Sequence, residues 1–174
     1  MKKFIFLFCL AFINNIYAQK YFVALCSKQA SVNSFGHAFV VIGKGDAFTC
    51  NVDGGDGEAW GLYAKNQSNS ECKPKGFNAL KSFFIGALPG CLFNDINTDI
   101  SNYYEIKCSF EEYIVVQTII SEWRNKNYEL TKSDCLSFLI AIASTFKDKI
   151  KLPDRDLFEN LPNKYVQKLI DLNR

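Results

Sequence analysis

The chain has 174 residues and one histidine, His37, in the stretch N-S-F-G-H-A-F-V-V-I. Cys135 lies in S-D-C-L-S-F-L-I-A-I-A-S-T-F, where Ser133 is a good N-cap and the following residues are apolar almost all round. In the first turn of such a buried helix, unpaired N–H groups favour a thiolate, and the cysteine N–H is free to donate to an oxyanion. Because this thiolate needs an imidazole within reach, we predict that His37 and Cys135 form a nucleophile and acid/base pair.

Each residue also has a purely structural interpretation. A lone histidine before a strand is more often structural, and a helical cysteine in an exported protein is more often half of a disulfide. The catalytic interpretation is strengthened when the two are considered together, because a strand start and a helix N-terminus are the places where catalysis needs these side chains.

A third side chain usually orients the histidine. The tight turn G-K-G-D at residues 43–46 predicts a hairpin in which residues 47–52 return antiparallel to the histidine strand. Asn51 is then the first choice for the orienting residue. A change of one residue in register leaves Thr49 and Asp53 as alternatives.

Three further residues are candidates for substrate binding. Trp60 and Tyr63, in W-G-L-Y, either line a substrate cleft or fix the preceding turn to the core. Asp134 stands directly before the candidate nucleophile. The acidic stretch D-G-G-D-G-E at residues 53–58 has oxygens at alternate positions but lacks a full calcium-loop pattern, so a flexible turn is favoured over a calcium site.

The first 18 residues have the pattern of a secretory signal peptide. M-K-K gives a positive start, F-I-F-L-F-C-L-A-F-I an apolar core, and I-Y-A a small-residue site that predicts cleavage after Ala18. An uncleaved anchor is the alternative. The apolar run is too short to span a bilayer, and nothing later approaches that length. We therefore expect a secreted or periplasmic protein, with residues 19–174 forming a single domain.

Composition restricts the possible partners and cofactors. The formal net charge of +2 falls to about zero once Lys2 and Lys3 leave with the signal peptide, and no basic patch remains to favour nucleic acid. With one histidine and no C-x-x-C pair, a structural metal site is disfavoured, and no cofactor is expected. A monomer is expected.

Six cysteines follow the signal peptide, and in an oxidising compartment they allow fifteen complete pairings. Cys50 with Cys72 and Cys91 with Cys108 are attractive pairs because each closes a short segment. Cys26, in a predicted strand, would then be buried and reduced.

The chain reads as α+β, with a small antiparallel sheet packed against helices. Ser109 and Glu112 form a capping box at the start of a helix that should run to about residue 125. The other predicted elements are strands over 21–26, 37–42, 47–52 and 103–108, a short helix near 78–88, the helix of Cys135, and a last short helix near 163–171.

Three short motifs resemble one family of hydrolases. F-G-H-A-F-V, W-G-L-Y and Y-E-L-T-K-S-D-C-L-S-F resemble the circularly permuted papain-like branch of the NlpC-type cell-wall peptidases, which includes the lecithin–retinol acyltransferase group. The histidine stretch is also similar to bacterial envelope domains with an S-x-F-G-H-T motif, with Ala38 in place of threonine. The likeness covers most of residues 20–145. Relatives often have asparagine where this chain has Asp134.

The resemblance implies a permuted papain-like fold in which histidine precedes cysteine. It also implies attack by Cys135 on an amide or ester carbonyl, an acyl-thioester, and His37 as acid and base. With export, this gives a secreted cysteine hydrolase cleaving an amide in peptidoglycan peptides or another envelope substrate. One alternative is a lipid acyl hydrolase or acyltransferase of the same fold. Another is a non-catalytic, disulfide-stapled binding module in which Cys135 is bridged.

Overall fold

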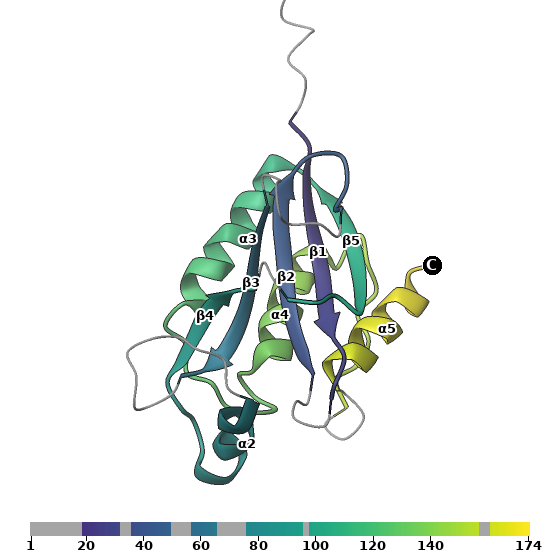
Figure 1. Cartoon of the computed structure of the whole chain (residues 1–174). Helices are drawn as coiled ribbons and strands as arrows, with labels where there is room; N and C mark the ends of the chain where they lie inside the picture. The colour runs from purple at the N-terminus through teal and green to yellow at the C-terminus, as the bar shows by residue number, and fades with distance from the viewer. Residues whose placement is uncertain (1–18, 32–35, 50–56, 66–75, 96–97, 157–160) are drawn as a thin grey trace, which may run out of the picture.

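A computed structural model of the chain describes residues 19–31, 36–49, 57–65, 76–95, 98–156 and 161–174. In this part the protein is α+β, as predicted, with a five-stranded antiparallel sheet in the order β4-β3-β2-β1-β5 (Figure 1). The strands are β1 (Tyr21–Lys28), β2 (His37–Lys44), β3 (Gly57–Ala64), β4 (Gly90–Asn94) and β5 (Asn102–Cys108), and the helices are α2 (Gly76–Ile85), α3 (Phe110–Trp123), α4 (Cys135–Ala143) and α5 (Pro162–Leu172), with a short 3₁₀ turn, η1 (Ser144–Phe146), after α4.

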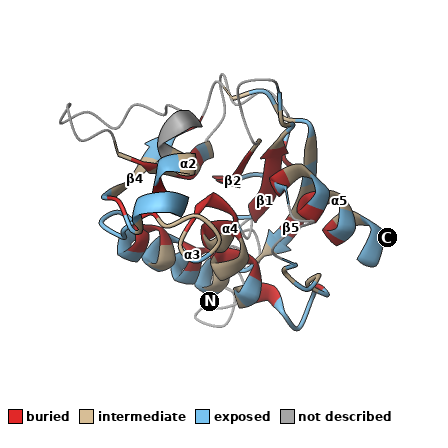
Figure 2. Ribbon diagram, turned by 90° about the horizontal axis from the view of Figure 1, so that it is seen from below, coloured by how far each residue is buried: buried red, intermediate tan, exposed pale blue. Residues whose placement is uncertain are grey.

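The two central strands are apolar on both faces, and both faces are covered. One face packs against α3, α4 and α5 in the main core, which contains Val23, Val40 and Leu139. The other face carries a smaller cluster around Phe39 and Phe48. Figure 2 shows the buried residues gathered along the strands and on the sides of the helices toward them. Continuous apolar runs are expected for strands buried in this way.

The helices begin for local reasons that the sequence largely predicts. The Ser109 side chain accepts from Glu112 N and the Glu112 side chain accepts from Ser109 N, which confirms the predicted capping box of α3. At α4 the cap is one residue later than predicted: Asp134, not Ser133, caps the helix through Ser137. The Ser133 hydroxyl does not cap the helix and donates to Asn127 O.

The predicted hairpin after β2 is wrong. Residues 47–49 are described and form no strand, and β2 has β1 on one side and β3 on the other. The neighbour of β2 on the side away from β1 is therefore residues 57–61 of β3, with Phe39 opposite Gly61. The ladder positions that residues 47–52 would need are already occupied. Residues 50–52 lie outside the described part of the chain.

The cysteines partly follow the prediction. Cys26 is a buried thiol outside any disulfide, as predicted. The predicted bridge between Cys91 and Cys108 is wrong, because Cys108 carries a free thiol while Cys91 is disulfide-bonded. Cys50 and Cys72 lie outside the described residues.

Two further sequence predictions concern the ends and the membrane. The predicted signal peptide, residues 1–18, lies outside the described part of the chain. Within the residues that are described, no helix is both long enough and apolar enough to cross a bilayer.

Candidate functional site

His37 is the first residue of β2, at the end of the sheet where β1 finishes. Its register partner on β1 is Lys28. The residue is only 8% exposed, and its ring stacks on Tyr63 with centroids 4.1 Å apart. The imidazole is thus held at the mouth of a strand with little freedom to turn.

The carboxylate that contacts His37 belongs to Asp95, directly after β4. Asp95 Oδ2 lies 3.1 Å from His37 Nε2, and both side chains are almost fully buried. Tyr63 donates its hydroxyl to Asp95 Oδ1 at 2.6 Å, and Thr98 Oγ1 donates to the same oxygen at 3.1 Å. One carboxylate oxygen therefore serves two hydroxyl donors, and the other is directed at the imidazole.

The Asp95 backbone is fixed as firmly as its side chain. Its N–H donates to Ala59 O at 3.1 Å, which continues the β4–β3 pairing by one residue, and its carbonyl accepts from Thr98 N at 2.8 Å. The edge strand and the turn after it thus place the carboxylate.

Cys135 is the first residue of α4, as the sequence predicts, and it is 8% exposed with a free thiol. The nearby Cys135 thiol helps to raise the pKa of His37. No described residue accepts a hydrogen bond from the Cys135 N–H, as expected at the first position of a helix. The Cys135 thiol and the buried Asp95 carboxylate therefore both influence the His37 imidazole.

The electrostatics of His37 follow from these neighbours. Burial alone would lower its pKa, but hydrogen bonds to Asp95 and Cys135, with the negative charges of both, raise the pKa from 6.5 to about 9. The imidazolium is therefore the stable form at neutral pH. Burial, and then the Asp95 charge, raise the pKa of Tyr63, so its hydroxyl stays a donor.

Asp134 has the contacts of a helix cap. Its carboxylate accepts from Ser137 N and from Thr131 N at 2.8 Å each, and it pairs with the Arg155 guanidinium at 2.6 Å. Thr131 has a φ of 74°, so this backbone bond is made by a left-handed residue. Arg155 also donates to Ser137 Oγ. These bonds hold the start of α4, and a contact between Asp134 and substrate stays a prediction.

The other predicted residues are placed as follows. Tyr63 is at the site, but its hydroxyl and ring hold Asp95 and His37. Trp60 is partly buried against the core, donates to Glu58 and lies under the Arg124 guanidinium. Substrate binding by either stays a prediction.

The predicted orienting residues stand apart from the described site. Asn51 and Asp53 lie outside the described residues, and Thr49 is exposed. In the described part of the chain, the group on His37 is Asp95.

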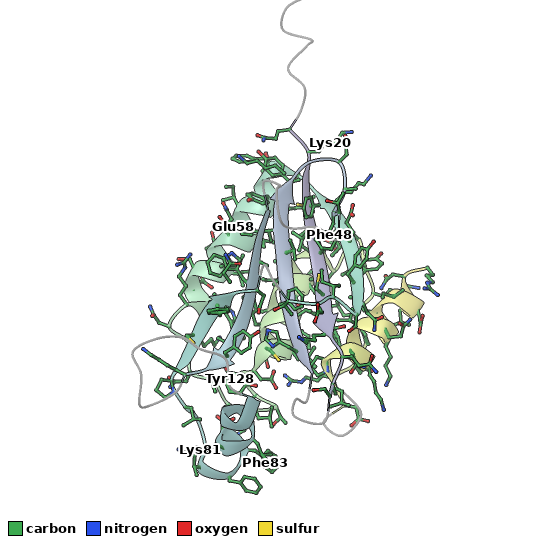
Figure 3. The ribbon with its side chains drawn as sticks, in the orientation of Figure 1. Lys20, Phe48, Glu58, Lys81, Phe83 and Tyr128 are labelled. Carbon is green, nitrogen blue, oxygen red and sulfur yellow. The ribbon has the colours of Figure 1, made fainter. Side chains whose placement is uncertain are left out.

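Sequence reasoning missed two residues of the site, Asp95 and Tyr128. Asp95 ends the run C-L-F-N-D, and the strand in that run was not predicted. The available signal was Thr98, three residues later, whose hydroxyl donates to the Asp95 carboxylate as in a turn. Tyr128 is 4% exposed, and its backbone exchanges two hydrogen bonds with Leu88. Figure 3 places it at the end of the sheet from which α2 projects.

The surroundings of Tyr128 shift its pKa. Burial raises its pKa well above the ordinary value, and the negative charges of Cys135 and Asp134 raise it further. A phenol in that setting remains protonated and able to donate.

In comparisons with known proteins, no protein-family model, curated sequence or solved structure matches this chain.

Proposed function

We propose that this protein is a cysteine hydrolase that cleaves an amide through an acyl-thioester on Cys135. One observation carries the proposal: the His37 imidazole lies 3.1 Å from the buried Asp95 carboxylate, and Cys135 at the start of α4 is near enough to raise the pKa of that imidazole. That is the order of contacts of a nucleophile, its acid/base and the group that orients the base. The histidine-first order and the helix that begins at Cys135 support a permuted papain-like fold.

The chemistry follows from the protonation states. The Cys135 thiolate attacks the carbonyl carbon, and the carbonyl π electrons move to oxygen. The carbon–nitrogen bond then breaks while the His37 imidazolium gives its proton to the leaving amine. Water attacks the thioester with His37 as base, which releases a carboxylic acid and restores the thiol. Asp95 keeps the ring oriented and stabilises its cationic form.

Two groups can stabilise the oxyanion. The Cys135 N–H lies at the helix N-terminus and has no acceptor among the described residues. We assign the second donor to Tyr128, whose hydroxyl is protonated and whose pKa is raised by burial and by the charge of the nearby Cys135. Losing one such donor typically costs about 10²–10³ in kcat.

The proposed substrate is an amide of the cell envelope, with peptidoglycan peptides first. The predicted signal peptide would place the enzyme beside that substrate, and the resemblance to NlpC-type peptidases points to the same bond.

A lipid acyl substrate is the second candidate, because α2 is exposed and apolar at its end. Phe83, Phe84 and Ile85 are 58%, 75% and 58% exposed, and Figure 3 shows Phe83 on the part of α2 that projects from the body. Ser82 Oγ accepts from Leu130 N, which ties α2 to the loop that leads to the nucleophile. Exposed aromatic side chains on a helix are suited to contact with lipid.

Alkylation kinetics test the proposed nucleophile. At about pH 6, where ordinary thiols are protonated, iodoacetamide should label Cys135 rapidly. Cys108 serves as the internal control because burial raises its pKa to about 11. His37→Gln should slow labelling of Cys135 by about tenfold or more. Labelling of Cys135 no faster than that of Cys108 would contradict the proposal.

Product analysis separates the two substrates. The protein is incubated with purified peptidoglycan peptides and with phosphatidylglycerol vesicles, and the products are identified by mass spectrometry against Cys135→Ser. Cleaved peptide amides support the first candidate, and released fatty acid supports the second. In the lipid case, Phe84→Ser should reduce activity on vesicles and leave the labelling of Cys135 unchanged.

A further inference from the structure

Gly61 lies beside the pair formed by His37 and Asp95. It is in the middle of β3, buried, and pairs with Phe39 of β2. A Cβ built on Gly61 would come closer than 3.0 Å to both Asp95 Oδ2 and His37 Nε2, the two atoms of the pair that face each other. Atoms of real side chains do not approach so closely, so the pair and a side chain at position 61 compete for one space.

The backbone does not explain this glycine. The described glycines with positive φ are Gly36, Gly45 and Gly86, so Gly61 has a backbone that any residue can adopt. Glycine inside a strand weakens it and often marks a place where another group approaches closely. At Gly61 the groups that approach are the imidazole and the carboxylate.

We propose that Gly61 is a positioning residue, whose missing side chain leaves the space in which the His37 imidazole and the Asp95 carboxylate meet. Tyr63, two residues along the same face of β3, completes the arrangement by stacking on the ring and donating to the carboxylate. β3 thus supplies both the space for the pair, at Gly61, and the side chain that packs against it, Tyr63. For catalysis the proposal rests on the proposed function, but as geometry it can be tested without a substrate.

The closing experiment uses Gly61→Ala in the full chain, with Gly57→Ala as its matched control. Gly57 is in the same strand, and a Cβ there would meet only Ile42 O at 3.5 Å and Val41 Cγ1 at 3.8 Å, which is ordinary contact. Because the chain has one histidine, an NMR titration of the imidazole reports His37 alone. The groups that face His37 are Asp95, Cys135 and Tyr63.

In Gly61→Ala the methyl group should force the pair apart, and the pKa of His37 should fall from about 9 to below about 7.5. Gly57→Ala should titrate like the wild type. A Gly61→Ala protein whose His37 also titrates like the wild type overturns the proposal. If the pKa falls while wild-type Cys135 shows no enhanced alkylation, the geometry holds and the hydrolase proposal fails.

A double variant covers the case in which Gly61→Ala folds poorly. Asp95→Ala removes one of the two groups that the new methyl would strike. The fall in Tm caused by Gly61→Ala should therefore be at most about half as large in the Asp95→Ala background as in the wild type. An equal fall in both backgrounds would show that Gly61 is needed for the strand and not for the pair, and would overturn the proposal.

Discussion

Replacing Asp95 with asparagine removes the charge that holds the His37 imidazolium, and the effect can be worked from the structure. Opposite unit charges 3.1 Å apart attract by roughly 5 kcal/mol at an effective dielectric constant of about 20. Burial of the imidazole opposes this attraction. Cys135 adds to the attraction, and the net result of all three, a pKa of about 9 in place of 6.5, corresponds to roughly 3 kcal/mol in favour of the charged form.

The sign of the pH dependence follows from that pKa. Because the folded-state pKa is raised above the ordinary value of 6.5, the stabilisation is fully present below pH 6.5 and is lost as pH rises through about 9. In Asp95→Asn the imidazole is still buried, which lowers its pKa, while the carboxylate charge that raises the pKa is gone. The pKa of His37 should then fall to about 7 or below, and the stability should change little across that interval.

Two measurements check this prediction. The first is an NMR titration of the single imidazole, and the second is urea unfolding at pH values from about 6 to about 10. Asp99→Asn is the matched control, because it removes a carboxylate from the same loop whose side chain is 93% exposed and pairs only loosely with Lys28. A pKa of His37 within about half a unit of the wild type in Asp95→Asn would refute the reasoning.

Three further substitutions test other contacts of the site and core. Tyr63→Phe removes a donor to the buried carboxylate and should cost about 1–3 kcal/mol in urea unfolding, whereas Tyr104→Phe, at a partly buried tyrosine of β5 that packs against the main core, should change little. Asp134→Ala removes the cap of α4 and the partner of the half-buried Arg155 guanidinium, and should lower the unfolding free energy by about 1–2 kcal/mol; an unchanged midpoint would contradict the cap. Leu139→Ala should cost about 2–5 kcal/mol because the side chain is fully buried, and Ile114→Ala, at 41% exposure, should cost far less in the same assay.

The parts of the fold that follow from local rules were predictable. The capping box of α3, the apolar strands β1 and β2, and Cys135 at the start of α4 each depend on neighbours in sequence. The pairing of His37 with Cys135 also came from local signals, since each residue stands where an element begins.

What could not be predicted depends on long-range pairing. β2 pairs with β3, which begins at Gly57, although the turn signal directly after β2 favoured an earlier partner. Local sequence patterns do not indicate how far along the chain the pairing strand lies. Asp95 reaches His37 only because β4 pairs with β3 and ends beside it. Sequence reasoning therefore could not identify the contact between Asp95 and His37, which depends on this register, and Asn51 and Asp53 lie outside the described residues.

Asp95 also links His37 to an edge strand of the sheet. β4 is an edge strand, bonded to β3 alone in the sheet, and its residues are half-buried or exposed. Edge strands open locally at lower free energy than central ones, so fraying of β4 should release the carboxylate while the rest of the sheet stays folded. The fraction of molecules in which Asp95 contacts His37 is then set by the opening equilibrium of five edge residues, and amide exchange in β4 should become slower as the proton affinity of His37 rises.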